Sequence, residues 1–262
     1  MLTNNLNPVI FEFGVISIRW YGILLALGIL VSILVLVKLF KQKGWTMDQT
    51  LDLCIWLVIG GLVGARLGEV FFYSFSYYSQ NPWEILFINH GGLSSHGMTL
   101  GLLLTTYLYC KAKKIPWLSM LDTFIIVVPL LSTFIRIGNF FNSEIVGRIT
   151  TLPWGVYFMR YEQFPLLRHP VQLYEALATL TIFVLIYFVY KKYSAVWPAG
   201  SVFFLFLFVY FSARFCLEFF KEYQTSWEGI LTAGQWLSLP FIIISLVWFY
   251  KIKKGKSKLP ST

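Results

Sequence analysis

The chain has 262 residues, of which 57% are hydrophobic, 19% are aromatic and only 13% are charged. Its mean hydropathy is positive, and a soluble domain of this length could not bury so much apolar surface. Composition therefore excludes a soluble globular protein and predicts an all-α polytopic membrane protein. The formal net charge of +9 would suggest nucleic-acid binding, but the placement of the charges argues against it.

Lysine and arginine occupy different parts of the chain. Of the fourteen lysines, all but Lys221 lie in short clusters at alternate ends of apolar segments, the pattern that marks cytoplasmic loops. Anionic membrane lipid, not nucleic acid, is their expected counter-charge. All seven arginines lie inside apolar segments or in the opposite loops. Because a guanidinium suits phosphate and carboxylate best, the arginines predict an anion site toward the outer face.

Seven apolar segments are predicted to span the membrane, with the N-terminus outside and the C-terminus in the cytoplasm. In chain order they cover about 15–40, 50–73, 98–109, 118–141, 169–190, 200–220 and 234–250. The whole chain, 1–262, is then a single transmembrane domain. Residues 142–170 form its largest outer segment, predicted to be a small head. The arginines of this head, Arg148, Arg160 and Arg168, are candidates for substrate capture.

The first two predicted helices each carry polar residues inside apolar sequence. Tyr21 follows an arginine and a tryptophan at the outer end of the first helix, where an interfacial aromatic belt is an equally good interpretation. Gly60, Gly64 and Gly68 recur every four residues in the second helix, which predicts a face for close helix packing. Arg66 lies between them in sequence and must point to a partner or a cavity.

A glycine-rich stretch at 90–97 precedes the third predicted helix and contains His96. Paired glycines beside hydroxyl groups predict a tight, re-entrant backbone, which is tolerated at membrane depth only where protein or water surrounds it. This backbone would carry His96 to the membrane edge. A lone histidine is more often structural than functional, and both interpretations remain open.

The fourth predicted helix ends in the most unusual stretch of the chain. An arginine near mid-depth of a bilayer costs roughly 2.5 to 3.5 kcal/mol on insertion scales, so such side chains face a bundle interior or a polar cavity. Arg136 and Asn139 are three residues apart and share a helical face. With Asn142 and Glu144 they are interpreted as one wall of an active site.

The sixth predicted helix carries Arg214 and Glu218, four residues apart on one face. They predict an intramembrane ion pair, for which a neutralising structural role is an equally good alternative. Given the predicted topology, several separate segments bring polar groups to the outer half of the bundle. These groups are Tyr21, His96, Arg136, Asn139, Glu144, Arg214 and Glu218.

Common cofactor and metal motifs are missing from the sequence. It contains no Walker loop, dinucleotide glycine pattern or His-Glu-x-x-His, and the spacing of its three histidines matches no familiar metal site. We therefore expect neither cofactor nor metal. Cys54, Cys110 and Cys216 are predicted to be buried free thiols. No cleaved signal peptide is expected, because no basic residue precedes the first apolar segment.

Six motifs in chain order carry a resemblance to a known family. They are Trp20-Tyr-Gly22, Gly64-Ala-Arg-Leu-Gly68, His90-Gly-Gly-Leu-Ser-Ser-His-Gly97, Arg136-Ile-Gly-Asn-Phe-Phe-Asn-Ser-Glu144 with Gly147-Arg148, His169-Pro-Val-Gln-Leu-Tyr-Glu175, and Arg214-Phe-Cys-Leu-Glu218. Over about 8–240 the chain thus resembles bacterial prolipoprotein diacylglyceryl transferase. It departs from the usual family pattern at Met98 and over 221–228, where loop flexibility and peptide docking are affected more than the chemistry.

The resemblance implies an enzyme of the bacterial cytoplasmic (inner) membrane with its active site toward the outer leaflet. It would transfer the diacylglyceryl group of phosphatidylglycerol to the lipobox cysteine of a prolipoprotein signal peptide, forming a thioether and releasing glycerol phosphate. The resemblance makes Arg136 and Arg214 essential and places Tyr21, His96, Asn139, Glu144, Gly147 and Glu218 around them. Arg66 and Asn142 complete the predicted substrate-binding set.

The chemistry of the reaction suggests roles for these side chains. Arg136 and Arg214 would hold the phosphate and stabilise the charge that it gains on departure. Only a thiolate attacks well, and a free thiol has a pKa of about 8.5. His96 is one candidate base, because imidazole titrates near neutral pH. Alternatively, His96 binds the headgroup and the field of the arginines acidifies the thiol.

Two other classes of function are weighed against the transferase. A transporter or flippase of an anionic lipid would also use an arginine cavity, but it predicts access from both faces and often two related halves. Here the polar residues gather in the outer half and no internal repeat is visible. A non-catalytic membrane scaffold gives no reason for the separation of lysine from arginine.

Overall fold

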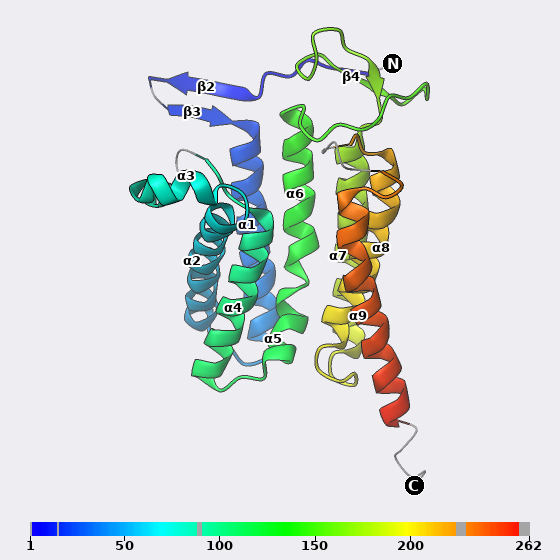
Figure 1. Cartoon of the computed structure of the whole chain (residues 1–262). Coiled ribbons are helices and arrows are strands. Elements are labelled where there is room, and N and C mark those ends of the chain that lie inside the picture. Colours follow the sequence, from blue (N-terminus) through cyan, green and yellow to red (C-terminus); the bar gives the residue numbers. More distant parts are fainter. Residues whose placement is uncertain (1, 15, 88–90, 224–228, 257–262) are drawn as a thin grey trace. The chain divides into compact units, whose positions relative to one another are not determined.

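A computed structural model describes residues 2–14, 16–87, 91–223 and 229–256 (Figure 1). The chain forms two compact units. The first unit comprises Met1–Leu34 with Phe124–Thr262, and the second unit comprises Val35–Thr123.

Long helices make up most of both units. Six helical segments among the described residues are long and apolar enough to cross a membrane, so the prediction of a multi-pass helical membrane protein is confirmed. They are α1 (Trp20–Lys41), α2 (Met47–Phe72), α5 (Trp117–Phe124) with α6 (Val127–Phe141), α7 (Val171–Tyr193), α8 (Ser201–Leu217) with the 3-10 turn η3 (Glu218–Phe220), and α9 (Ala233–Lys256).

The third predicted helix forms α4 (Ser95–Lys113), which is longer than predicted but falls outside this group of six. Its 19 residues would suffice for a tilted span. Its sequence, however, includes His96 and several glycines and threonines, which lower its hydropathy. Before it, the predicted loop at 74–89 contains the short helix α3 (Phe75–Gln80) and the 3-10 turn η1 (Pro82–Leu86).

The all-helical prediction is wrong at the N-terminus of the first unit. β2 (Val9–Phe13) and β3 (Ile16–Arg19) pair antiparallel, so α1 begins at Trp20 and not near residue 15. Gly14 has a φ of +58°, in the left-handed region that glycine adopts without strain. Residues 16–18 are thus strand residues, although their hydropathy placed them at the start of the first predicted helix.

The 142–170 segment is a small sheet with its own apolar core. β4 (Val156–Phe158) pairs antiparallel with β5 (Leu167–Arg168) and parallel with β1 (Leu2–Asn4) from the chain's N-terminus. Val146 packs with Val156 and Phe158 in the buried cluster beneath the sheet. The Asn4 amide donates a 2.7 Å hydrogen bond to the carbonyl of Phe140, which ties β1 to the end of α6.

The second unit is built on close packing between α2 and α4. Gly64 faces Gly97 and Gly101 so closely that a Cβ on Gly64 would lie 2.5 Å from the carbonyl oxygen of Gly97 and 2.7 Å from the Cα of Gly101. A Cβ on Gly68 would lie 2.5 Å from the Cα of Gly97. The predicted packing face of the second helix is therefore confirmed.

In the first unit, α6 packs on α7, α7 on α8, and α8 on α9. The predicted helix at 118–141 is divided into α5 and α6, with a break before Pro129. Proline cannot donate to the carbonyl four residues earlier and its ring clashes there, which explains the break. Thr133 of α6 and Thr179 of α7 share a buried hydrogen bond of 2.9 Å.

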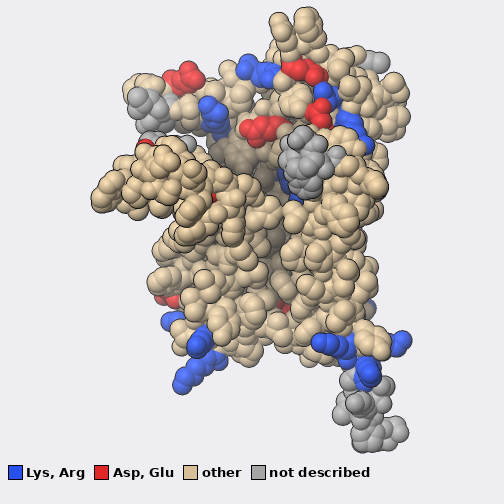
Figure 2. Space-filling model, viewed as in Figure 1, with Lys and Arg blue, Asp and Glu red and all other residues tan. Residues whose placement is uncertain are grey.

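Charged side chains of the first unit gather at helix ends. On the face drawn in Figure 2, lysines gather at the C-terminal ends of α7 and α9. These ends carry two of the lysine clusters that the sequence analysis assigned to the cytoplasm.

All three cysteines are free, as predicted. Cys54 and Cys110 are buried in the second unit, but Cys216 is exposed. The prediction of burial is wrong for Cys216 because α8 buries little of its surface against neighbouring helices, and an apolar residue on such a helix faces outward.

Candidate active site

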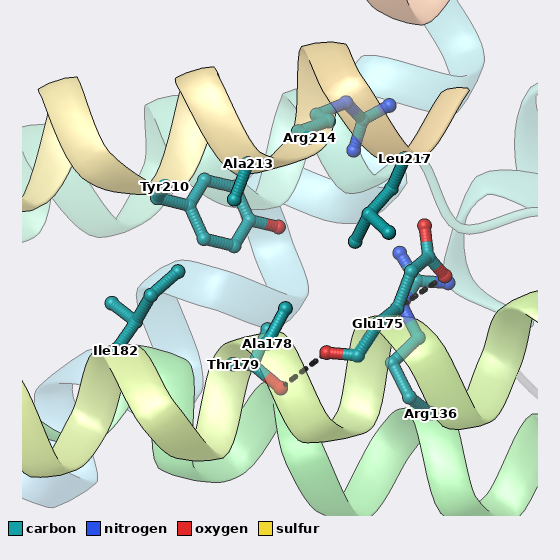
Figure 3. Close-up of a pocket in the computed structure, with 9 residues that line it drawn as sticks. All are labelled: Arg136, Glu175, Ala178, Thr179, Ile182, Tyr210, Ala213, Arg214 and Leu217. Atoms are coloured by element: carbon teal, nitrogen blue, oxygen red, sulfur yellow. Dashed lines mark hydrogen bonds and ion pairs between the residues drawn. The ribbon is translucent and has the colours of Figure 1, made fainter. Parts of the chain in front are cut away.

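The candidate site lies in the first unit where α6, α7 and α8 meet (Figure 3). A cavity of about 20 Å³, room for roughly one water molecule, opens between these helices. Three of its lining side chains are charged, one from each helix: Arg136, Glu175 and Arg214. The remaining lining residues are Ala178, Thr179, Ile182, Tyr210, Ala213 and Leu217.

Arg136 and Glu175 form a buried ion pair across α6 and α7. The Nε of Arg136 lies 3.0 Å from the Oε2 of Glu175, and their side chains are 16% and 9% exposed. Figure 3 shows the two side chains directed toward each other beside the cavity. Because a buried charge without a partner is costly, each of these groups offsets part of the cost of burying the other.

Lys221 connects this pair to a second carboxylate. It follows η3, is 5% exposed, and places its Nζ 3.4 Å from both Glu175 Oε1 and Glu218 Oε1. Glu218 Oε1 in turn lies 3.7 Å from an Nη of Arg214. Cations and anions therefore alternate along the five-residue charge network Arg136–Glu175–Lys221–Glu218–Arg214.

A branch of hydrogen bonds leads from Arg136 to Glu144. One Nη of Arg136 lies 3.4 Å from Asn139 Oδ1, and the Asn139 amide donates to Glu144 Oε2 over 3.0 Å. Asn142 donates to the other carboxylate oxygen over 3.2 Å, and Gln172 of α7 donates to the Glu144 carbonyl over 2.7 Å. The predicted wall of 136–144 is therefore a connected polar cluster.

The backbone after α6 turns so that Glu144 points back toward α6. Ser143 and Ile145 both have a φ of +56°, and the Glu144 N–H donates to the carbonyl of Asn139 over 2.9 Å. A positive φ is uncommon outside glycine and is an outlier for a β-branched residue such as isoleucine. This strained turn allows a carboxylate five residues beyond Asn139 to reach the Asn139 amide.

Tyr21 and Gly147 lie against other parts of the same cluster. Tyr21 of α1 packs on α6 so that a Cβ on Gly138 would lie 2.8 Å from its ring, and it interacts electrostatically with Glu144 and Arg136. Gly147 donates its N–H to the carbonyl of His169 over 3.0 Å, and a Cβ there would lie 2.5 Å from that oxygen.

The first unit thus brings together eight of the ten predicted site residues. They are Tyr21, Arg136, Asn139, Asn142, Glu144, Gly147, Arg214 and Glu218. The other two, Arg66 and His96, belong to the second unit.

Arg66 is buried and holds a loop of the second unit. Its guanidinium donates to carbonyls of η1 and of the adjoining loop, and its Cζ lies 4.9 Å from the ring centre of Tyr78. The predicted partner of Arg66 is therefore backbone. The five carbonyl acceptors belong to Glu84, Ile85, Phe87, Gly91 and Gly92.

His96 lies in the first turn of α4. Ser94 is the N-cap of this helix and accepts a 3.2 Å hydrogen bond from the N–H of Gly97. The Nδ1 of the exposed His96 ring lies 3.0 Å from the hydroxyl of Tyr73. His90, at the other end of the same motif, lies outside the described residues.

The family is decided by sequence comparison over nearly the whole chain. A family model described as Prolipoprotein diacylglyceryl transferase matches residues 8–251. The chain belongs to the prolipoprotein diacylglyceryl transferase family.

Curated relatives named phosphatidylglycerol–prolipoprotein diacylglyceryl transferase are similar to this family member from end to end. The relative from Tolumonas auensis is 39% identical over 263 residues, covering 98% of this chain and 100% of the relative. The relative from Bacteroides fragilis is 38% identical over 267 residues, covering 97% and 96%. The relative from Chloroherpeton thalassium is 38% identical over 258 residues, covering 96% and 95%.

Two charged residues of the site in this diacylglyceryl transferase family member, Glu175 and Lys221, were not predicted from the sequence. Glu175 ends one of the six family motifs but was not assigned to the site. Lys221 is the single lysine outside the four clusters, and that separation was the available signal. Among the residues that the structure describes, no group of three or more histidine, cysteine or acidic side chains could hold a metal ion.

Arg168 closes the 142–170 segment of the transferase fold onto the chain that follows η3. It pairs with both oxygens of Glu162 at 3.0 and 2.9 Å, with Glu222 at 2.9 Å, and with the carbonyl of Gly147 at 3.1 Å. Its guanidinium holds the pKa of Glu162 below the usual range. The Tyr161 hydroxyl donates to Glu222 over 2.6 Å, which raises the tyrosine pKa.

Of the three head arginines proposed for substrate capture, two are thus engaged within the protein. Arg168 is 5% exposed and held by two carboxylates. Arg148 donates to the carbonyl of Lys221 over 3.0 Å and lies 4.4 Å from the ring centre of Tyr223. Arg160 is exposed.

Proposed function

We propose that this protein is a bacterial phosphatidylglycerol–prolipoprotein diacylglyceryl transferase. It moves the diacylglyceryl group of phosphatidylglycerol to the lipobox cysteine of a prolipoprotein, forms a thioether and releases glycerol phosphate. The names of its relatives support this reaction. The structural observation that carries it is the pair of guanidinium groups, Arg136 and Arg214, that two membrane-length helices bring to one cavity.

In this proposal Arg136 and Arg214 hold the phosphate of the lipid. The thiolate sulfur attacks the carbon of the diacylglycerol unit that bears the phosphate ester, so a C–S bond forms as the bond between that carbon and the phosphate oxygen breaks. The electron pair of the broken bond stays on the phosphate oxygen, and the leaving glycerol phosphate gains negative charge. Guanidinium donors in a low-dielectric site stabilise that charge most where it develops.

The polar cluster around Glu144 orients the glycerol headgroup. Glu144 accepts hydrogen bonds from Asn139 and Asn142, so its carboxylate is held in place before substrate arrives. A carboxylate and two amides together accept and donate hydrogen bonds, as the hydroxyl groups of glycerol require. Tyr21 and Gly147 shape this cluster, while Glu218 positions Arg214.

His96 accepts the thiol proton in this proposal. Its Nδ1 contacts the Tyr73 hydroxyl, and this contact orients the ring. Nε2, the other ring nitrogen, then accepts the thiol proton. Arg66 acts indirectly, by holding the loop that leads to α4. If His96→Gln kept near-normal turnover while Arg136→Ala lost it, the base would be elsewhere and the phosphate clamp would stand.

The membrane topology is proposed from helix lengths and lysine placement. α4 is a further span, which brings the six helical segments to seven, because it packs on α2 through glycines at several successive turns. Lysines at the ends of α7 and α9 mark the cytoplasmic side of the inner membrane. The N-terminus and the 142–170 head then lie outside, the site opens to the outer leaflet, and both compact units belong to a single transmembrane domain.

A transfer assay tests the reaction directly. Purified protein is incubated with phosphatidylglycerol and a lipobox peptide, and the mass of the peptide is followed. We expect a diacylglyceryl mass gain that requires the peptide cysteine and is lost in Arg136→Ala and Arg214→Ala. Lys251→Ala, which removes a positive charge from the exposed end of α9, is the matched control and should be fully active. A folded preparation that binds the lipid but never modifies the peptide would favour lipid transport instead.

A further inference from the structure

Lys221 is a buried lysine to which the proposed reaction assigns no role. Its side chain is 6% exposed and its Nζ lies 3.4 Å from one oxygen of each of two carboxylates. Its backbone is fixed as well, because its carbonyl accepts from Arg148 over 3.0 Å and it bridges to Gly147. Burying an ammonium group is costly, so a buried lysine held at both backbone and side chain requires an explanation.

Lys221 changes the charge balance of the network beside the cavity. The network holds three cations, Arg136, Lys221 and Arg214, against two carboxylates, Glu175 and Glu218. One positive charge is therefore unmatched within these five residues. A phosphodiester carries one negative charge, and a phosphate monoester carries about 1.5 to 2 near neutral pH.

Lys221 also contacts the two carboxylates, Glu175 and Glu218, that pair with the two arginines. Glu175 meets Arg136 through a single contact at Nε, and Glu218 lies 3.7 Å from Arg214, beyond normal hydrogen-bond distance. The other oxygen of Glu175 contacts Lys221. In Glu218, Oε1 is shared between Arg214 and Lys221, and Oε2 accepts a 3.4 Å hydrogen bond from Thr232. Among the residues that the structure describes, neither arginine forms a bidentate pair with a carboxylate.

Arg168 shows the opposite arrangement in the same protein. Glu162 engages Arg168 through both of its oxygens, at 3.0 and 2.9 Å. Bidentate pairing of this kind uses up the planar edge of a guanidinium. Glu175, in contrast, contacts Arg136 only at Nε, and its other oxygen contacts Lys221.

We propose that Lys221 is a positioning residue that keeps Arg136 and Arg214 open for the substrate phosphate. By drawing Glu175 and Glu218 toward its ammonium group, it prevents either carboxylate from closing onto an arginine. It also supplies the unmatched positive charge that an incoming phosphate neutralises. This proposal rests on the proposed transferase reaction and deepens it.

The test compares Lys221→Met with Lys221→Arg in the transfer assay. We expect Lys221→Met to raise the KM for phosphatidylglycerol at least about tenfold and to weaken inhibition by glycerol phosphate to a similar extent. Lys221→Arg should restore most of both values, because it keeps the charge. Lys251→Met, at the exposed end of α9, is the matched control and should change neither value.

A double variant separates positioning from simple structural support. In Lys221→Met with Glu175→Gln, the remaining network again has one unmatched positive charge and Arg136 has lost its acidic partner. We expect this double variant to bind glycerol phosphate better than Lys221→Met alone, at a similar unfolding temperature. If Lys221→Met folds and keeps wild-type KM and inhibition, or if the double variant brings no recovery, the role of Lys221 is overturned. Absence of transfer by the wild-type protein would instead overturn the proposed function.

Discussion

The close contact between α2 and α4 makes a sharp prediction about two neighbouring glycines. Gly64→Ala would place a Cβ 2.5 Å from the carbonyl oxygen of Gly97 and 2.7 Å from the Cα of Gly101. Both contacts are to backbone, which cannot rotate away as a side chain can. In contrast, a Cβ on Gly61 meets only side chains, at 3.4 Å from Leu102 and 3.7 Å from Met98.

The magnitude follows from these distances. Relieving the contacts at Gly64 requires the two helices to separate by several tenths of an ångström along their interface. Overpacking of this kind costs typically about 1–3 kcal/mol, whereas alanine gains up to about 1 kcal/mol over glycine in helix propensity. We therefore expect Gly64→Ala to lose about 1–2 kcal/mol and Gly61→Ala to be neutral or slightly stabilising.

Thermal unfolding in detergent, followed by tryptophan fluorescence, measures the difference. A loss of 1–2 kcal/mol corresponds to a fall in Tm on the order of 5 °C for a unit of this size. Gly61→Ala is the matched control, since it makes the same chemical change three residues away on the same helix. Equal unfolding temperatures for the two variants would refute the reasoning that backbone contact at Gly64 sets the helix separation.

Three further predictions concern the first unit. Gly234→Ala would place a methyl group against the Glu218 carboxylate. We expect this variant to raise the KM for phosphatidylglycerol although no charge changes. An unchanged KM would contradict the role of Glu218 in positioning Arg214. Arg168 lowers the pKa of Glu162, so the stability from this pair is present above about pH 4.5 and is lost as the pH falls through the lowered value. Glu162→Gln should flatten that acid limb of Tm against pH. Finally, Cys216 should react with a membrane-permeant maleimide before the two buried cysteines do, and simultaneous labelling would contradict its exposure.

The sequence predicted the long helices well because each one carries a local signal. Hydropathy over about 20 residues locates a span without any knowledge of its neighbours. The N-terminal strands were missed because hydropathy does not identify strand pairing: it assigns Val9–Phe13 to a short outer segment, and Ile16–Arg19 to the start of the first span. Their pairing, and that of Leu2–Asn4 with Val156–Phe158, depends on partners that hydropathy does not register.

In the candidate site too, contacts between residues close in sequence were predicted and contacts between distant residues were not. Arg136 with Asn139, and Arg214 with Glu218, are three and four residues apart, so helical spacing alone predicts that each pair shares a face. The contact of Lys221 with Glu175 joins residues 46 positions apart in the chain. No local pattern encodes such a contact, which explains why the two residues at the centre of the network were not assigned to the site.

The most strained backbone of the first unit lies where the site was predicted. Ser143 and Ile145 hold positive φ angles on either side of Glu144, and residues in sparsely populated regions cost on the order of 1–3 kcal/mol each. A regular helix end would avoid that cost but would carry Glu144 away from the Asn139 amide. The surrounding hydrogen bonds, from Gln172 to the Glu144 carbonyl and from two asparagines to its carboxylate, maintain the turn. Strain that is maintained by so many contacts at one carboxylate supports the proposal that the position of Glu144 serves substrate binding more than stability.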